Sequence, residues 1–291
     1  MGRAVLLLIK SDKPEAVAAA EELRDLIGRR GKVVATLDAD SSPLPRNMHR
    51  PDMVVVLGGD GTLLAQSRRC LDLGAPMLGV NLGKIGFLAE FDLASVRLQA
   101  ESLFGDGPLA LRRLGLLHAE VHEPEKQWVR FAGEALNDVV ITAGPPYRLI
   151  TLSLTIDGTP GPTVNGDGLI VCTPTGSTAY NLSAGGPIVA PTVDAMTITP
   201  IAAQSLAFRP IVVGGNSIVE LTVQRVNVGE PPGTGTTLVL DGQVQTALKL
   251  GDRIVVTTHG KGVRFVRNPA SDYWSRLINK LHWARAPRPR A

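Results

Sequence analysis

Residues 54–62 have the sequence Val54-Val55-Val56-Leu57-Gly58-Gly59-Asp60-Gly61-Thr62, in which an apolar run leads into a glycine turn around one carboxylate. The β-branched run predicts a buried strand. Glycine lets a ligand approach the main chain closely, because it has no side chain. We therefore expect a wall of backbone N–H groups with Asp60 fixed at the tip of a strand. Such a wall suits a nucleotide that carries a hydroxyl to be activated.

The glycine turn matches neither of two common nucleotide-binding motifs. A Walker A loop ends in Gly-Lys-Ser/Thr, whereas Gly61-Thr62-Leu63 stands here, and the Rossmann fingerprint needs glycine or alanine where Leu64 stands. The turn is either a phosphate-donor loop, made by Gly58, Gly59, Gly61 and Thr62, or a structural turn in which Asp60 caps the next helix. A carboxylate with a pKa of about 3.9 is too weak a base to deprotonate a hydroxyl beforehand. Asp60 would therefore orient the hydroxyl first and accept its proton late in phosphoryl transfer.

A second run, residues 165–187, contains few charges and many small hydroxylated residues. Gly168 to Thr173 predicts a strand, and Thr178 to Ala184 predicts a short helix after a turn. A helix N-terminus after a turn favours phosphate, because its N–H groups are unpaired and its dipole attracts anions. The carboxylate, hydroxyls and ring in this run belong to Asp167, Thr178, Ser183 and Tyr180. Each of these taken singly is also a common turn or capping residue.

Three further patterns bear on the site. Asn137 and Asp138 stand in an apolar strand, where a polar pair needs partners such as an adenine edge or ribose hydroxyls, or else forms a bulge. Asp241-Gly242-Gln243 predicts a hairpin turn, and Gln243 is either a turn residue or a ligand contact. His118 and His122 have the spacing of a helical metal pair, but their surroundings alternate like a strand, so we predict no metal site.

Strand and helix signals alternate in the first part of the chain. Strands are predicted at Ala4–Ile9, Lys32–Leu37, Met53–Leu57 and Pro76–Leu82, with helices at Pro14 to about Gly31, Thr62–Leu73 and Asp92–Phe104. This order predicts an α/β domain over residues 1–111, with a parallel sheet and helices on both faces.

The remainder is predicted as strands followed by one helix. Strand signals at Leu136–Thr142, Leu149–Ile156, Gly168–Thr173, Ser217–Val223, Thr237–Leu240 and Arg253–Thr258 predict a β-rich, sandwich-like domain over residues 112–262. The segment 263–284 contains a predicted helix from Asp272 to Trp283. Residues 285–291 predict a disordered basic tail.

Composition narrows the class of partner. The chain has 291 residues, with 30 basic and 27 acidic side chains and a net charge of +3, so it does not require nucleic acid as a partner. Aromatic residues make up 4%, which argues against stacking platforms for single strands. No apolar stretch approaches the ~18 residues of a membrane helix, and the start lacks a signal-peptide pattern. We expect Cys70 and Cys172 to be buried thiols in a reducing cytoplasm.

The two glycine-rich runs together resemble the NAD kinase family, whose members phosphorylate NAD to NADP. Four other segments are similar to motifs of that family: Gly79–Leu88, Ala135–Asp138, Asp241–Gln243 and Asn268–Trp283. The resemblance thus spans most of the chain. It implies an α/β N-terminal domain, a β-rich C-terminal domain, and a final helix that packs back on the first domain.

The resemblance implies an enzyme that transfers a phosphoryl group from ATP or polyphosphate to the 2′-hydroxyl of the adenosine ribose of NAD. Asp60 would be the proton acceptor. The residues that would contact NAD are Asp60, Gly61 and Phe87 at its border, Asn137 and Asp138 at the adenine-side ribose and base, Asp167, Thr178, Ala179, Tyr180 and Ser183 along the pocket, Arg148 at phosphate, and Gln243.

The resemblance also implies partners and a location. It implies a cytoplasmic homodimer or homotetramer whose active sites are completed by a neighbouring subunit. A divalent cation, usually Mg²⁺, would be carried by the donor phosphates rather than by a protein cage. Asp138 is a departure, since many members carry Glu, and the shorter carboxylate should bind with an altered contact to the base. The choice between ATP and polyphosphate, and between NAD and NADH, stays open.

Two alternative functions also stay open. A diacylglycerol or sphingoid kinase shares the Gly-Gly-Asp-Gly loop, but it would not need the run Thr173–Tyr180 and should present a membrane-facing surface. A non-catalytic NAD(P) sensor could keep the same fold, although the intact Asp60 and glycines argue against it.

Overall fold

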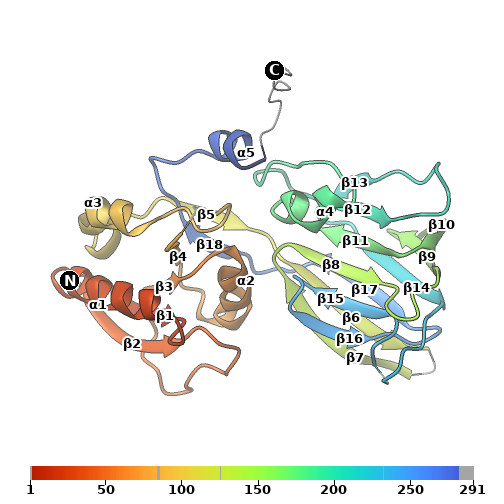
Figure 1. The fold of residues 1–291 in the computed structure, drawn as a ribbon, viewed down its shortest axis with the longest axis horizontal. Helices are drawn as coiled ribbons and strands as arrows, with labels where there is room; N and C mark the ends of the chain where they lie inside the picture. The colour runs from red at the N-terminus through yellow and green to blue at the C-terminus, as the bar shows by residue number, and fades with distance from the viewer. Residues whose placement is uncertain (1, 84–85, 125, 232, 282–291) are drawn as a thin grey trace, which may run out of the picture. The chain divides into compact units, whose positions relative to one another are not determined.

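The structure is a computed structural model that describes residues 2–83, 86–124, 126–231 and 233–281. It divides into two compact units. Unit 1 comprises the residues up to Arg113 together with those from Val263 onward, and unit 2 comprises Leu114–Gly262 (Figure 1). The predicted tail, 285–291, and the last residues of the predicted final helix lie outside the described residues.

Unit 1 is an α/β unit around one six-stranded sheet. Its strands occur in the order β2-β1-β3-β4-β18-β5, and the pairs β1–β2, β1–β3, β3–β4 and β4–β18 are parallel. The elements are β1 (Ala4–Ile9), α1 (Pro14–Gly28), β2 (Lys32–Asp38), β3 (Met53–Leu57), α2 (Asp60–Arg69), η1 (Leu71–Leu73), β4 (Met77–Val80), α3 (Leu93–Phe104), β5 (Leu111–Leu114), β18 (Val263–Val266) and α5 (Tyr273–Leu281). The predicted parallel α/β architecture is therefore confirmed.

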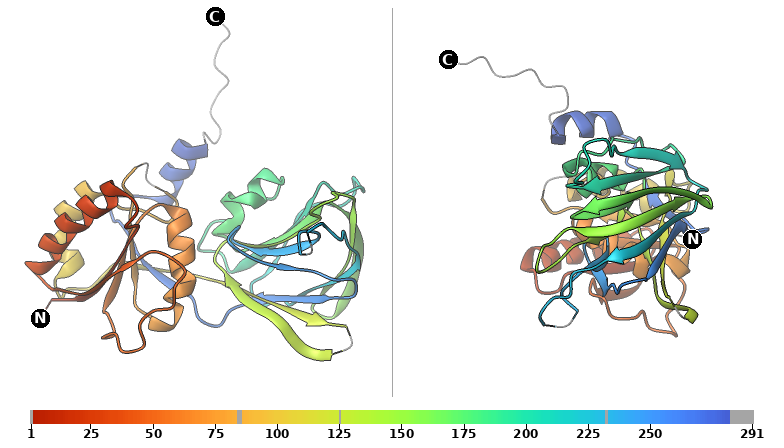
Figure 2. Two further views of the ribbon diagram at one scale, coloured as in Figure 1. Left: turned by 60° about the horizontal axis from the view of Figure 1, so that its bottom comes forward. Right: turned by 90° about the vertical axis from the view of Figure 1, so that its right-hand side faces the viewer.

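The helices of unit 1 cover both faces of this sheet. Apolar residues of α1 and α3, among them Leu23, Ile27 and Phe104, pack on one face with Leu7 and Val55. α2 lies on the opposite face (Figure 2). Because alternate residues of β1 and β3 point to opposite faces, every residue of these central strands except Ala4 is buried. The chain runs from β1 to one side and from β3 to the other, so the sheet has a topological switch point between these strands.

The boundaries of α2 differ from the prediction. The sequence predicts a helix over Thr62–Leu73, whereas α2 begins at Asp60 and ends at Arg69, and a separate 3₁₀ turn covers Leu71–Leu73. Gly74 then adopts a left-handed backbone with φ of 60°, which ends the turn. The helix starts earlier than predicted because Asp60 takes a helical conformation directly after the N-cap residue Gly59.

Unit 2 is a sandwich of two six-stranded antiparallel sheets, with strand orders β10-β9-β14-β17-β6-β7 and β13-β12-β11-β8-β15-β16 (Figure 2). Its elements are β6 (Leu117–Glu123), β7 (Lys126–Ala135), β8 (Asp138–Thr142), β9 (Ile150–Ile156), β10 (Thr159–Gly166), β11 (Gly168–Cys172), η2 (Gly176–Thr178), α4 (Tyr180–Ser183), β12 (Ala195–Ile201), β13 (Ile211–Gly214), β14 (Val219–Arg225), β15 (Thr237–Leu240), β16 (Val244–Ala247) and β17 (Arg253–Thr258). The predicted β-rich sandwich is confirmed.

Alternation along the strands gives the second sheet of unit 2 an inner and an outer face. Val139 and Ile141 of β8 point into the core between the sheets, together with Leu221 and Ile254 from the other sheet. Val140 points the other way and packs with residues of the outer face. The segment η2–α4 lies on this outer face, since Ala184, at its end, contacts the same small cluster.

Three further findings concern expectations from the sequence. Cys70 and Cys172 are free, buried thiols, and burial raises their pKa values to about 11 and about 12. Among the described residues, no helix is both long and apolar enough to span a bilayer. His118 and His122 lie on the strand β6, as their alternation predicts, and not on a helix.

Candidate active site

The carboxylate of Asp60 stands at the carboxyl end of the central strand β3, beside the switch point of the unit 1 sheet. Open α/β sheets bind their ligands at such a point. Oδ2 of Asp60 accepts a hydrogen bond from the backbone N–H of Phe87 at 2.8 Å, and Oδ1 accepts from those of Leu88 and Ala89 at 3.1 Å each. Asp60 therefore does not cap its own helix, and the alternative of a purely capping aspartate is wrong.

A tight turn presents these three amides to Asp60. The N–H of Gly86 donates to the carbonyl of Ala89 at 3.0 Å, which closes the turn. A Cβ atom at position 86 would overlap Oδ1 of Asp60, so only glycine allows the carboxylate to reach the turn. This turn, residues 86–89, is called the amide turn below. It fixes the half-buried carboxylate in one place.

The two glycines before Asp60 differ in the space that a Cβ atom would have at each position. A Cβ atom at Gly58 would press against the side chain of Thr62 at 2.7 Å, so Gly58 is required by internal packing. A Cβ atom at Gly59 would meet no atom of the described residues within 4 Å, and the φ of −82° at this position is open to any residue. The backbone at Gly59 thus faces open space at the start of the ten-residue helix α2.

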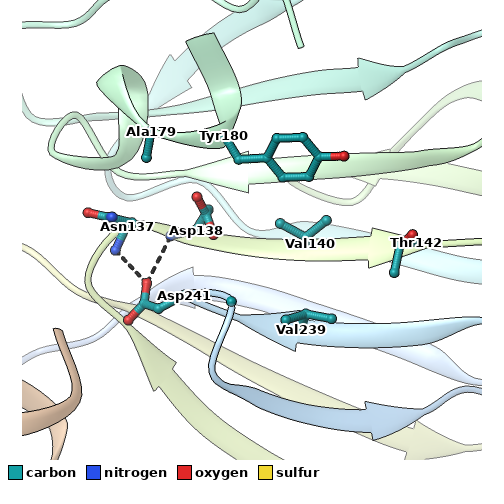
Figure 3. A pocket seen from close by; sticks show the side chains of 9 residues that line it. Asn137, Asp138, Val140, Thr142, Ala179, Tyr180, Val239 and Asp241 are labelled. Carbon is teal, nitrogen blue, oxygen red and sulfur yellow. Dashed lines mark hydrogen bonds between the residues drawn. The ribbon is translucent and has the colours of Figure 1, made fainter. Parts of the chain in front are cut away.

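Unit 2 holds a pocket of about 320 Å³ on the outer face of its second sheet (Figure 3). Its floor is the apolar pair Val140 and Val239, which are register partners on β8 and β15. Ala179 and Tyr180 lie on one side of β8, and Asp241 lies on the other side. The full lining is Asn137, Asp138, Val140, Thr142, Ala179, Tyr180, Val239, Asp241 and Gly242. This combination of an apolar floor with a few polar groups is typical of small-molecule sites.

Asp241 shapes the polar end of the pocket. Its Oδ1 accepts from the backbone N–H groups of Asn137 at 2.7 Å and Asp138 at 3.2 Å, and its Oδ2 accepts from that of Leu136 at 3.0 Å. Asp241 itself is buried and has a left-handed backbone, with φ of 51°. The polar pair that the sequence placed inside a strand is therefore held at the start of β8 by a carboxylate from a hairpin.

Asp138 is an unusual carboxyl group. It is 5% exposed, and burial, with a smaller contribution from the nearby Asp241 carboxylate, raises its pKa to about 7. Near neutral pH this group is therefore divided between a neutral form that can donate a hydrogen bond and an anion that only accepts. Perturbed carboxyl groups of this kind in a pocket are candidates for ligand contacts.

The run 173–189 is held onto the sheet by buried polar side chains. Nδ2 of Asn181, which is fully buried, donates to the carbonyls of Ser177 and Pro187, and its Oδ1 accepts from the hydroxyls of Thr197 and Thr199. The hydroxyl of Thr173 donates to the carbonyl of Leu136 at 2.6 Å. These bonds fix Ala179 and Tyr180 over the pocket. The predicted helix over Thr178–Ala184 is shorter than expected, because α4 has only four residues, and so no helix N-terminal anion site follows from it.

The structure brings some of the predicted NAD-contact residues together and not others. Asn137, Asp138, Ala179 and Tyr180 line the pocket, and Tyr180 is 47% exposed, with its ring available to a ligand. The following predicted residues of unit 2 are not among those that line it: Arg148, Asp167, Thr178, Ser183 and Gln243. Asp167 precedes β11 beside the far end of β8, whereas Arg148, Ser183 and Gln243 are exposed on a loop, on α4 and in a hairpin turn.

Five pocket residues were not predicted. Val140 and Thr142 follow Asp138 at a spacing of two, so strand alternation alone could have placed them on the same face. Val239 belongs to β15, which is distant in sequence, and Asp241 and Gly242 belong to the turn after it, so only the pairing of β15 with β8 brings them to the pocket.

Within the described ranges, no group of three or more His, Cys, Asp and Glu side chains is placed to hold a metal ion. The carboxylate of Asp60 already accepts three amide hydrogen bonds. The described side chains therefore include no protein cage for Mg²⁺, which needs several oxygen ligands in octahedral geometry.

Comparisons with known proteins give matches over most of the chain. Family models described as the ATP-NAD kinase N-terminal domain and the ATP-NAD kinase C-terminal domain match residues 41–107 and 136–268. An NAD kinase of Syntrophobacter fumaroxidans is 37% identical over 291 residues, which covers 98% of this chain and all of that protein. An NAD kinase of Nitratidesulfovibrio vulgaris strain DP4 is 38% identical over 278 residues, covering 94% of this chain and 90% of that protein.

Two solved structures share the fold. Yeast NADH kinase complexed with NADH matches with a TM-score of 0.81 at 23% identity, covering the whole of this chain and 90% of that one. An NAD kinase from Archaeoglobus fulgidus in complex with ATP matches with a TM-score of 0.68 at 21% identity, covering 96% of this chain and 97% of that one.

Proposed function

The chain belongs to the NAD kinase family and phosphorylates NAD with ATP to give NADP, and we propose that Asp60 accepts the proton of the acceptor hydroxyl. The hydroxyl is the 2′-hydroxyl of the adenosine ribose. One observation carries the proposal: three consecutive amides hold the half-buried carboxylate of Asp60 at the carboxyl end of β3. No other carboxylate follows a strand of this sheet in a glycine turn within the described part of the chain.

The hydrogen bonds of Asp60 leave room for a substrate. A carboxylate offers about four lone-pair directions, and three accept from the amide turn. Among the described residues Oδ2 accepts only from the N–H of Phe87, so the remaining direction lies on Oδ2. A ribose hydroxyl that donates there would be oriented for attack, and its proton would pass to Oδ2 as the bond to phosphorus forms. Phosphoryl transfer gains most from such positioning, because its transition state is loose.

We assign the donor phosphates to the start of α2. The backbone at Gly59 faces open space at the start of a ten-residue helix. The dipole of a helix favours phosphate at its N-terminus. Mg²⁺ would arrive with the donor phosphates and neutralise their charge, since the described side chains offer no cage for it.

We assign the adenosine part of NAD to the pocket of unit 2. Its volume of about 320 Å³ lies within the range of small-molecule sites. The half-exposed ring of Tyr180 can stack on a base or nicotinamide, while Val140 and Val239 offer an apolar floor. Asn137 and Asp138 supply the hydrogen-bonding groups that an adenine edge or a ribose diol needs. Phe87, Asp167, Thr178, Ser183, Arg148 and Gln243 stay predicted contacts that further parts of the dinucleotide would reach.

The finer assignments of assembly and location belong to the same proposal. We expect a homodimer or homotetramer, which light scattering coupled to gel filtration would measure directly. A cytoplasmic location is supported by two free, buried thiols. Polyphosphate stays an alternative donor to ATP.

The test is NADP formation by the purified protein with NAD, Mg²⁺ and either ATP or polyphosphate, detected by an NADP-specific dehydrogenase. We expect turnover with ATP. Asp60→Asn should lose most of the turnover and keep NAD binding, measured by calorimetry, because the pocket of unit 2 is unchanged. Normal turnover by Asp60→Asn would refute the role of Asp60. A protein that binds NAD without turnover would instead be a sensor, and activity only on lipid vesicles would indicate a lipid kinase.

A further inference from the structure

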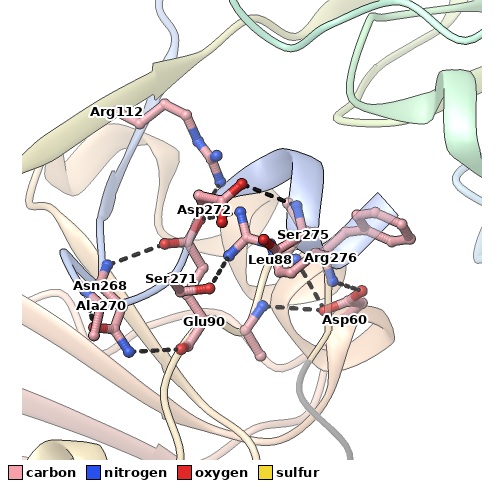
Figure 4. A network of polar contacts seen from close by, with 12 residues as sticks. Asp60, Leu88, Glu90, Arg112, Asn268, Ala270, Ser271, Asp272, Ser275 and Arg276 are labelled. Carbon is pink, nitrogen blue, oxygen red and sulfur yellow. Dashed lines mark hydrogen bonds and ion pairs between the residues drawn. The ribbon is translucent and has the colours of Figure 1, made fainter. Parts of the chain in front are cut away.

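Glu90 is a buried acidic residue that directly follows the amide turn. Glu90 is only 2% exposed. Its Oε1 accepts hydrogen bonds from Nη2 of Arg112 and Nη2 of Arg276, each at 2.8 Å (Figure 4). Its Oε2 accepts from the backbone N–H of Asn268 at 3.0 Å, and Nδ2 of Asn268 donates to the carbonyl of Glu90 at 3.1 Å. Both the side chain and the main chain of Glu90 are thus fixed.

Two of the three residues that bind Glu90 come from the C-terminal segment, and the third, Arg112, lies on β5. Asn268 follows β18, and Arg276 lies on α5, where it is 8% exposed and also donates to the hydroxyl of Ser271. The C-terminal segment of unit 1 therefore fixes Glu90, which follows Ala89. The N–H of Ala89 donates to Asp60.

The same helix also contacts the other end of the amide turn. The ring of Tyr273 lies 6.5 Å from the ring of Phe87, and Nζ of Lys280 lies 5.2 Å from the centre of that ring. The N–H of Phe87 is the donor to Oδ2 of Asp60. Helix α5 thus contacts Phe87 within the amide turn and, through Arg276, binds Glu90 directly after it.

A buried carboxylate with two guanidinium groups is a costly way to gain stability alone. Desolvation of the charges offsets much of their attraction, and well-packed apolar residues of similar size often stabilise a fold as well. What such a network does supply is a defined geometry, since its hydrogen bonds have fixed directions. Here the fixed geometry is that of the three amides that place Asp60.

We propose that Arg276, acting through Glu90, is a positioning residue for Asp60, and that α5 is a working part of the kinase centre. This inference rests on the proposed function, because it needs Asp60 to act on the acceptor hydroxyl. Loss of Arg276 would let the amide turn shift and misplace the carboxylate. Misplacement by about 1 Å costs on the order of 100-fold in rate, while substrate binding elsewhere is unchanged.

The experiment compares Arg276→Met with Arg276→Lys and with Arg130→Met as a matched control. Arg130 also makes a largely buried ion pair, with Asp252, but in unit 2 and away from the pocket lining. For Arg276→Met we expect kcat to fall at least about tenfold, with KM for NAD and for ATP within about twofold. Arg276→Lys should recover part of kcat. Arg130→Met should lower the melting temperature with kcat unchanged.

Two further variants keep the inference testable if Arg276→Met does not fold. Tyr273→Leu removes the ring that contacts Phe87, and we expect kcat to fall with KM unchanged. Tyr273→Phe is its control, because the Tyr273 hydroxyl is buried without a hydrogen-bond partner among the described residues. Unchanged kcat in folded Arg276→Met, or in folded Tyr273→Leu, would overturn the inference.

A double variant separates this inference from the proposed function. If Arg276 acts through Asp60, then adding Arg276→Met to Asp60→Asn should change the residual kcat by less than about twofold, because residues that act as a unit are not additive. An additive further loss would overturn the positioning role. Full activity of Asp60→Asn alone would refute the proposed function instead, whatever Arg276→Met does.

Discussion

Replacing Gly86 with alanine tests the amide turn by adding a single methyl group. An added Cβ would overlap Oδ1 of Asp60, whereas the backbone at position 86 has no left-handed angle that would itself exclude alanine. The strain therefore falls on the contact with the carboxylate. Gly83 offers a control three residues earlier, since among the described residues a Cβ there meets the Asn81 side chain alone, at 3.9 Å, an ordinary contact.

The expected magnitude follows from these contacts. To reach a normal carbon–oxygen separation of ~3.3 Å, the carboxylate of Asp60 must retreat by about 1.5 Å. Hydrogen bonds of 2.8, 3.1 and 3.1 Å cannot all survive such a shift. Each bond to a charged group contributes about 1.5–3 kcal/mol, and half-exposure reduces this, so we expect a loss of about 2–4 kcal/mol in stability. Misplacement of the acceptor should lower kcat about 100-fold, equivalent to about 2.7 kcal/mol.

The assay is the coupled NADP measurement, with calorimetry to establish the folded fraction of each variant. Gly86→Ala should lose kcat while KM for NAD stays within about twofold, because the pocket of unit 2 does not include position 86. Gly83→Ala should behave like the parent. A folded Gly86→Ala protein with at least half of the parent kcat would refute the view that the amide turn sets the position of Asp60.

Three other predictions concern the pocket and the donor loop. Asp138 has a folded pKa of about 7 against a reference of 3.8, so its contribution to stability is full below pH 3.8 and is lost as pH rises through 7, up to about 4 kcal/mol. The melting temperature of Asp138→Asn minus that of the parent should therefore be larger at pH 8 than at pH 5. An equal difference at both pH values would contradict this. Asp241→Asn keeps an acceptor for the amides of Asn137 and Asp138, but it places an NH₂ group against the N–H of Leu136, so two donors face each other. This change should raise KM for NAD about fivefold or more and leave KM for ATP unchanged. Gly59→Ala should fold normally and raise KM for ATP, since its methyl group meets no protein atom; an unchanged KM would remove Gly59 from the donor site.

Much of the fold could be predicted because its signals are local. The apolar runs of β1 and β3 predict central parallel strands, and the limits found for them, Ala4–Ile9 and Met53–Leu57, match the prediction. The start of α2 was missed by two residues because a glycine turn looks the same in sequence whether it precedes the helix or forms its first turn. The helix over Thr178–Ala184 was predicted too long because Ala179 leaves the helical conformation, with φ of −97° and ψ of −130°, and separates the 3₁₀ turn η2 from α4.

The site could be predicted only in part, because its polar groups are partnered across long sequence distances. The sequence indicates that Asp60 is special, but its donors lie at 87–89, and no local pattern says that they face it. Asp241 was predicted as a turn residue, which it is, yet its carboxylate organises residues 136–138. Glu90 has no sequence signal at all, since its meaning depends on Arg276 from the end of the chain.

Asp60 of unit 1 and Asp241 of unit 2 have the same hydrogen-bond pattern. Each carboxylate accepts hydrogen bonds from three consecutive backbone amides, at 87–89 and at 136–138. The exposed fractions of the two residues differ. Asp241 is buried, and its carboxylate holds the segment 136–138. Asp60 is half-buried, and among the described residues one lone-pair direction of its carboxylate has no partner, which we propose binds the substrate hydroxyl. If this distinction is right, Asp241→Asn should act on substrate affinity and Asp60→Asn on turnover. The two aspartates accept the same number of amide hydrogen bonds. If one variant changes KM and the other changes kcat, then exposure, rather than the hydrogen-bond pattern, decides which aspartate reacts.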